Sequence, residues 1–162
     1  MWIDFEQLPE DARLWIFSID GVMNGERRSA LEGSLRNFIL EWTSHQLTLK
    51  ASAAVVEDRF IIVGLDQSQS GASGCSIDKL MRLIQNLEVT TGLGLLLKNK
   101  IAIRNASGVQ WKTVRELKQE KTDGSLDEKS IYYDTLVDSM YLFKHQWMKN
   151  LDEGWLGKKL NN

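Results

Sequence analysis

Lys50-Ala-Ser-Ala-Ala-Val-Val-Glu57 and Arg59-Phe-Ile-Ile-Val-Gly-Leu65, with Asp58 between them, are the two runs of sequence that decide the fold. Both runs are strand-like, and a single residue separates them. So short a link joins only antiparallel strands, because parallel strands need a crossover of a dozen or more residues. The stretch therefore predicts an antiparallel hairpin.

A strand and a helix precede this hairpin. Ala12–Ile19 reads ARLWIFSI, which is rich in β-branched and aromatic residues, and it ends at the turn signal Asp20-Gly21. Asn24 is a suitable N-cap for a helix over Glu26–Thr43. The apolar residues of that segment have the spacing of one helix face: Leu31, Leu35, Phe38, Ile39 and Trp42.

A second helix and two further strands follow the hairpin. Helical spacing returns at Ile77, Leu80, Met81, Ile84 and Leu87, and glycines at 92 and 94 mark the helix end. Ile101–Arg104 then predicts a strand, and Val109–Lys112 another one after the turn Asn105–Gly108. The order β-α-β-β-α-β is that of a ferredoxin-like fold. We expect an α+β chain with an antiparallel sheet and both helices on one face.

The last third of the chain predicts more helix. Thr113-Val-Arg-Glu116 fits a capping box and begins a helix toward Lys121. Large apolar side chains then recur at roughly helical spacing, and we expect them to pack on the protein's own core and not on a partner: Leu136, Met140, Phe143, Trp147 and Leu151. We expect one domain over residues 1–162, with a core at about 11–112 and a helical C-terminal extension at about 113–162.

Composition limits the classes of function. The chain has 162 residues, 43% hydrophobic and 26% charged, which are ordinary values for a globular protein. Its formal net charge of -2 gives no general attraction to nucleic acid or to an anionic membrane. No apolar run approaches the roughly 20 residues that cross a bilayer, and the acidic segment Met1–Glu6 is not a signal peptide. Because we identify no export signal, we expect a cytoplasmic protein. The single cysteine, Cys75, allows no internal disulfide, which is consistent with a reducing compartment.

The segment Asp66–Lys79 is the best candidate for a binding or catalytic site. It combines two glycines and several hydroxyls with the start of a helix, whose free N–H groups and dipole attract anions. Such a place can hold a phosphate, a carboxylate or a thiolate. The candidate residues for an unidentified small ligand are Gly71, Ser73, Gly74, Cys75 and Ser76.

Two catalytic interpretations of this segment are open. Ser76-Ile-Asp-Lys79 matches the S-x-x-K pattern, in which the lysine activates the serine. Cys75 at a helix N-terminus could carry a thiolate, with His45 or His145 as its base. The structural alternatives are that Ser76 caps the helix and that Cys75 is a half-buried packing residue. We favour the structural alternatives and expect no catalytic set.

Nucleotide and metal sites lack their motifs. A phosphate loop needs G-x-x-x-x-G-K-[ST], but Gly71 and Gly74 are too close together and Lys79 lies a full turn downstream. Two histidines and one cysteine make no closed tetrahedral metal site. Three aspartates at strand ends or turns could form an oxygen site, although turn chemistry accounts for each of them: Asp20, Asp58 and Asp66. We therefore expect no cofactor and no metal.

Four segments carry a resemblance to known sequences: Arg13–Ile16, Phe38–Trp42, Arg59–Val63 and the most specific one, Gly71-Ala-Ser-Gly-Cys-Ser-Ile-Asp-Lys79. They resemble a small family of uncharacterised bacterial proteins of similar length, often labelled "ABC transporter ATPase". The resemblance covers about the first two-thirds of the chain. It implies no known activity and no catalytic residue, and the chain lacks the phosphate loop that the label requires.

The leading hypothesis is a non-enzymatic binding domain that self-associates, as a possible homo-oligomer. Its basis is the absence of a catalytic set, together with a sheet that can expose an edge or a face. The C-terminal third also contributes residue types that interfaces favour: Tyr132, Tyr133, Tyr141, Phe143, Trp147 and Trp155. The alternatives are a small enzyme or anion-binding protein that uses Gly71–Lys79 and, less favoured, a nucleotide-binding ATPase.

Overall fold

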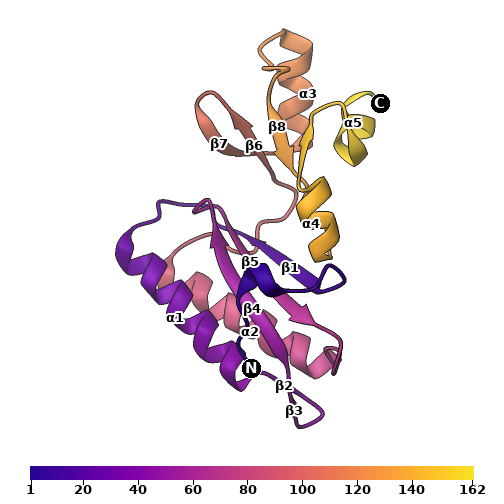
Figure 1. Ribbon diagram of the computed structural model, residues 1–162. Helices are drawn as coiled ribbons and strands as arrows, with labels where there is room; N and C mark the ends of the chain where they lie inside the picture. The colour runs from indigo at the N-terminus through magenta and orange to yellow at the C-terminus, as the bar shows by residue number, and fades with distance from the viewer. The chain divides into compact units, whose positions relative to one another are not determined.

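The computed structural model describes all residues, 1–162, and the chain forms two compact units (Figure 1). The first unit contains Met1–Leu97 and Asp138–Phe143, and the second contains Lys98–Val137 and Lys144–Asn162. The expected core of residues 11–112 coincides with neither unit, because the chain leaves the first unit after Leu97 and returns to it only at Asp138. No helix is both long enough and apolar enough to span a bilayer.

The first unit is a three-stranded antiparallel sheet with two long helices. Its elements are η1 (Phe5–Gln7), β1 (Arg13–Ser18), α1 (Gly25–Glu41), the short hairpin β2 (Thr43–Ser44) and β3 (Leu47–Thr48), β4 (Lys50–Val56), β5 (Phe60–Asp66) and α2 (Gly74–Thr91). The sheet order is β1-β5-β4, and the predicted hairpin is confirmed by the pairing of β4 with β5 from Lys50↔Asp66 to Val56↔Phe60.

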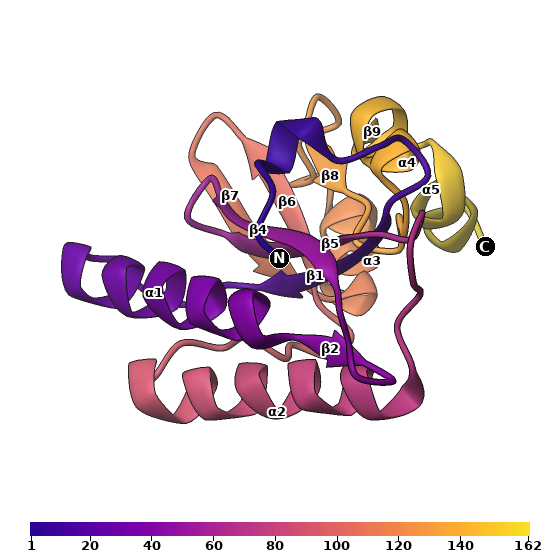
Figure 2. The same cartoon turned by 60° about the horizontal axis from the view of Figure 1, so that its bottom comes forward.

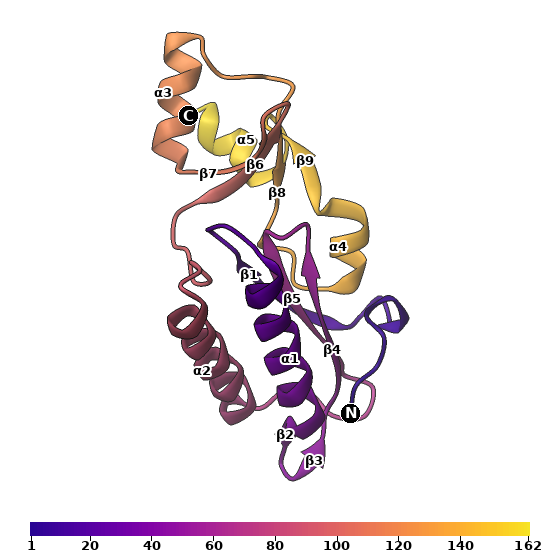
Figure 3. The ribbon, with the colours of Figure 1, turned by 90° about the vertical axis from the view of Figure 1, so that its left-hand side faces the viewer.

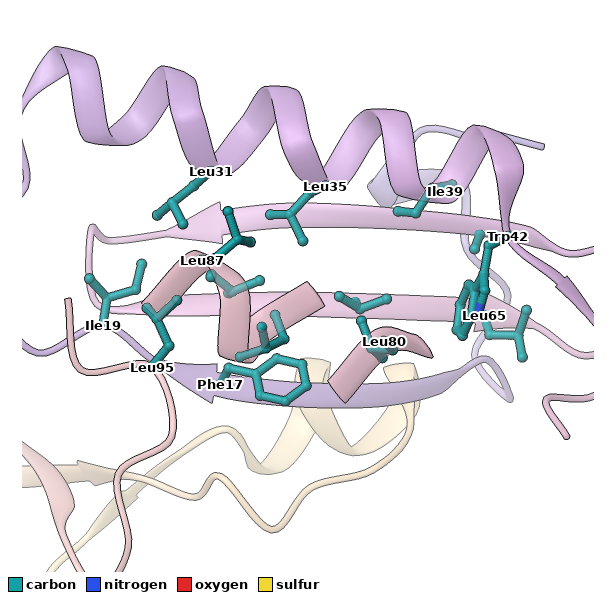
Figure 4. Close-up of a cluster of buried hydrophobic side chains, with 14 of the residues drawn as sticks. Phe17, Ile19, Leu31, Leu35, Ile39, Trp42, Leu65, Leu80, Leu87 and Leu95 are labelled. Carbon is teal, nitrogen blue, oxygen red and sulfur yellow. The ribbon is translucent and has the colours of Figure 1, made fainter. Parts of the chain in front are cut away.

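Both helices cover the same face of this sheet, as expected (Figure 2). The core beneath them combines three leucine or isoleucine side chains from each helix with side chains of the sheet (Figure 4): Leu31, Leu35 and Ile39 of α1, and Leu80, Ile84 and Leu87 of α2. Asn24 caps α1 by accepting a hydrogen bond from the Arg27 N–H at 2.8 Å, and Gly92 ends α2 in the left-handed conformation, with φ 69°.

The predicted strand after α2 exists but pairs in the other unit. β6 (Ile101–Asn105) lies between β7 (Gly108–Lys112) and β8 (Ile131–Tyr133). Ile101, Ala102 and Ile103 are all buried, so this strand is covered on both faces and suits the centre of a sheet. The α+β class with antiparallel sheets is therefore confirmed, whereas the four-stranded ferredoxin-like sheet is not formed by β1, β5, β4 and β6.

The second unit also contains α3 (Val114–Asp123), β9 (Met148–Asn150) and α5 (Gly154–Leu160). It is a four-stranded antiparallel sheet of order β7-β6-β8-β9 with helices α3 and α5. The capping box at Thr113 and Glu116 is confirmed, since each residue's side chain accepts a hydrogen bond from the other's backbone N–H. The core of this unit contains Ile101, Ile103, Leu117, Tyr132, Leu151, Leu156 and Leu160.

The prediction of one helix through Leu136–Leu151 is wrong. Only α4 (Met140–Gln146) is helical there, and the chain then forms β9. The Trp147 C=O accepts a hydrogen bond from the Asp134 N–H at 2.8 Å, so its backbone continues the pairing of β9 with β8. The large side chains of this run also differ in environment, because Leu136 is 68% exposed while Met140 is buried. The C-terminal extension is therefore a mixed helix-and-sheet unit and not helical.

Candidate functional site

The segment expected to carry chemistry begins at Asp66, the last residue of β5. The Asp66 carboxylate accepts a hydrogen bond from the Ser68 N–H at 2.9 Å, and it pairs with the Lys50 ammonium at 3.0 Å. Hydrogen bonds from Ser68 hold the pKa of this carboxyl below its ordinary value, and Lys50 adds to the effect. The side chain is only 6% exposed, so the ionised carboxylate anchors the start of the loop.

Ser73, and not Ser76, caps α2. The Ser73 Oγ accepts a hydrogen bond from the Ser76 N–H at 3.2 Å, and the Ser76 Oγ donates to the Ser73 carbonyl at 2.8 Å. Ser76 is buried, and its own carbonyl accepts a hydrogen bond from the Trp42 Nε1 at 2.9 Å. This bond connects the end of α1 with the start of α2, so Ser76 supports the packing of the two helices.

The other candidate residues, Cys75, His45 and Lys79, form no hydrogen bond with one another. Cys75 is exposed, which contradicts the half-buried position expected for it. His45 lies in the tight turn between β2 and β3, with φ 49°, and is also exposed. No hydrogen bond joins Cys75 to His45, and Lys79 is exposed on the first turns of α2. The structure therefore provides Cys75 with no hydrogen-bonded base.

The three aspartates considered for an oxygen site serve separate local contacts. Asp20 exchanges two backbone hydrogen bonds with Gly94, at 2.9 and 2.8 Å, and the Asp58 carboxylate pairs with Arg28. No group of three or more histidine, cysteine, aspartate or glutamate side chains gathers to hold a metal ion.

The aromatic residues of the C-terminal third are used mainly inside the protein. Tyr132, Tyr133 and Trp147 are all buried, and the rings of Tyr133 and Trp147 lie 5.2 Å apart. Trp155 is half-buried and donates its Nε1–H to Asp134 at 3.1 Å. Three of the six aromatic side chains expected at an interface are therefore buried within the chain, whereas Tyr141 is 49% exposed.

A groove of about 460 Å³ lies in the first unit between α1 and the outer edge of β4. Figure 3 shows α1 running alongside β4, with the N-terminal segment of the chain close to the strand. Both secondary-structure elements and the N-terminal segment line the groove: Trp2, Ser29, Glu32, Gly33, Leu35, Arg36, Ala53, Ala54 and Val55.

The backbone of β4 is unpaired along this groove. The Ala51 N–H donates to the Met1 carbonyl at 2.9 Å and the Ala51 carbonyl accepts from the Ile3 N–H at 3.0 Å, so the backbone groups of Ala51 point away from β5. Because backbone direction alternates along a strand, Ala53 and Val55 point the same way. Neither has a hydrogen-bond partner on that side. The edge is therefore open from Ala53 to Val55.

The N-terminal segment closes one end of this open edge. Trp2 forms a parallel bridge with Ala51, and the segment thus occupies the first position beside β4. The Arg36 guanidinium lies over the Trp2 ring, 4.8 Å from its centroid, which holds this ring at the end of the groove. At the other end, Glu57 and Asp58 turn the chain into β5 with positive φ angles of 52° and 54°.

The helical wall of the groove contains small residues. Ser29 and Gly33 are one turn apart on α1, and a Cβ added at Gly33 would meet nothing within 4 Å. Glycine inside a helix costs about 0.5–1 kcal/mol relative to alanine. No contact within the chain requires glycine at this position. Charged Glu32 and Arg36 flank it, and Glu32 pairs with Arg28 at 2.8 Å.

Sequence reasoning located α1 and β4 but missed the groove. A glycine inside a predicted helix was the available signal, since it has a cost and no evident packing role. Which strand edge is open depends on the order β1-β5-β4, and that order involves residues far apart in the sequence.

Comparison with known proteins gives no relative. The chain matches no protein-family model, and no curated protein and no solved structure is significantly similar to it.

Proposed function

We propose that this chain is a non-enzymatic binding domain, in which the groove between α1 and β4 receives a polypeptide segment in extended conformation. The observation that carries the proposal is the open backbone edge of Ala53 and Val55 beside a groove walled by α1. Exposed strand edges are templates for adding another strand, and proteins use this mode to recognise peptides.

The backbone of the edge would supply the affinity of such a complex. Ala53 and Val55 each offer one N–H and one C=O, and each hydrogen bond made to them contributes about 0.5–1.5 kcal/mol net. The groove itself would select the side chains of the added strand. Its lining includes the buried Leu35 and the half-buried Val55, whereas Ser29 and Gly33 are small residues on the helix side.

Two features support a binding role over catalysis. The Ser76 hydroxyl is engaged with the Ser73 carbonyl inside the helix cap, and Cys75 has no hydrogen-bonded base. The exposed thiol of Cys75 also suits a reducing compartment, so we assign this function to the cytoplasm.

The test is selection from a random-peptide library on the immobilised full chain. Selected peptides should shift the amide NMR signals of Ala53 and Val55 in the wild-type protein. Ala53→Pro should abolish their binding without unfolding the chain, because proline removes only an outward N–H that the fold does not use. Peptides that bind Ala53→Pro as tightly as the wild type would refute the proposal. A selection that yields no binder on a chain shown by sedimentation to be monomeric would refute it as well.

A second candidate is an anion-binding or enzymatic site at Gly71–Lys79. The exposed position of Cys75 in the first turn of α2 favours it, because the free N–H groups of a helix N-terminus attract anions there. A thiol reagent should then modify Cys75 faster in the folded chain than in the urea-unfolded chain at the same pH. Slower modification of the folded chain would exclude an activated thiol.

A further inference from the structure

We propose that the occupant of the groove is a second copy of this chain, related by a two-fold axis at Ala54, with the two β4 strands paired antiparallel. This proposal rests on the proposed function, namely that the β4 edge is a binding surface. It adds the identity of the partner and the register of the pairing.

The open edge has the length and the symmetry that such a pairing needs. Met1–Ile3 occupies the edge at Ala51, and the turn at Glu57 ends the strand, so only Ala53–Val55 remains open. A two-fold axis at Ala54 places Ala53 opposite Val55 of the second copy, and Val55 opposite its Ala53. In an antiparallel ladder, residues that face each other in this way exchange both backbone hydrogen bonds. A long strand from another protein would instead run into Met1–Ile3.

The same axis brings the two α1 helices together. A continuous sheet keeps α1 of both copies on one face, and the two-fold axis makes these helices antiparallel. Ser29, Gly33 and Leu40 follow the i, i+4, i+11 spacing of one helix face, and Leu40 is 50% exposed. Packed helices lie 8–10 Å apart, and small residues allow this approach. The space beside Gly33 is then filled by the second helix.

This helix face carries one acidic and one basic residue, so it can pair with the same face of a second copy. Glu32 and Arg36 lie one turn apart on α1 and both line the groove. Antiparallel helices that cross near Gly33 place Glu32 of one copy beside Arg36 of the other, and the same pair occurs twice. An interface between identical copies requires such self-complementarity, because the same surface serves on both sides.

The experiment is sedimentation equilibrium of the full chain over the micromolar range. Two variants each add an arginine to α1, one on the side that lines the groove and one on a side that does not. The wild type should show a monomer–dimer equilibrium. Gly33→Arg should weaken the dimer at least about tenfold by blocking the approach of the helices. Ala30→Arg makes a similar change at an exposed position of α1 that does not line the groove, and it should leave the equilibrium unchanged.

Three further variants separate loss of the interface from effects on the folding of α1, because one lies in β4 and the other two form a charge-reversal pair. Ala53→Pro should also prevent the dimer, while circular dichroism shows an intact fold. Glu32→Arg should weaken the dimer by placing like charges together, and adding Arg36→Glu should restore it.

A wild-type chain that stays monomeric would overturn this inference alone, since peptides could still bind the edge and shift Ala53 and Val55. A dimer that tolerates both Gly33→Arg and Ala53→Pro would overturn it as well, because another surface would then join the copies. If the chain is monomeric and no peptide binds, the proposed function fails together with the inference.

Discussion

Replacing Gly33 by alanine should stabilise the folded monomer although it harms the proposed interface. The added Cβ meets nothing within 4 Å, so it causes no clash inside the chain. Alanine is favoured over glycine inside a helix by about 0.5–1 kcal/mol, partly because glycine loses more backbone freedom on folding. The free energy of unfolding should therefore rise by about that amount.

The assay is urea unfolding, followed by circular dichroism at a protein concentration low enough for the monomer to dominate. Gly92→Ala is the matched control. Its added Cβ would also meet no clash, since the nearest atom is an Arg27 guanidinium nitrogen at 4.0 Å, but the residue ends α2 at φ +69°. A side chain in that left-handed conformation costs about 1–2 kcal/mol, so Gly92→Ala should be destabilising.

Opposite signs for the two glycines are the expected result. A loss of stability for Gly33→Ala at low concentration would refute the reasoning, because it would show that Gly33 is already packed against another part of the same chain. Unequal slopes of the urea transitions would mean that the unfolded or folded state had changed, and the comparison would then be repeated by calorimetry.

Three further predictions concern the segment from Asp66 to α2. The stability that the ionised Asp66 carboxylate contributes should be fully present above the ordinary pKa of an aspartate, and it should be lost as the pH falls through the lowered pKa of Asp66. The free energy of unfolding in urea should therefore depend less on pH in Asp66→Asn than in the wild type. Ser73→Ala removes the hydrogen-bonded cap of α2 and should cost about 1 kcal/mol in the same assay, and an unchanged midpoint would contradict the assignment of the cap. Calorimetry should detect no magnesium-dependent binding of ATP, and a saturable heat of binding would reopen the transporter-ATPase interpretation.

Local patterns predicted the first unit well. The hairpin β4–β5 and the faces of α1 and α2 follow from residues that are close together in the sequence. The cap of α2 was placed one turn too late, because Ser73 and Ser76 are both acceptable N-caps by residue type. Only the geometry shows that the Ser73 Oγ accepts the hydrogen bond and that the Ser76 hydroxyl donates to the Ser73 carbonyl.

The second unit shows where such patterns fail. Large side chains at Met140 and Trp147 have a spacing that fits one helix, but Trp147 packs on Tyr133 from a neighbouring strand. Local sequence patterns also could not predict the partners of β6, because the strands that pair with it can lie far away in the sequence. The groove beside Gly33 was missed for the same reason.

Amide hydrogen exchange of Ala53 and Val55, measured by NMR at increasing protein concentration, tests the open edge most directly. We predict rapid exchange of both amides in dilute solution and strong protection at high concentration. In the Ala53→Pro variant, the Val55 amide should exchange rapidly at every concentration. Rapid exchange at every concentration would show that no second copy covers the edge, and protection already in the dilute monomer would show that the edge of β4 is not open.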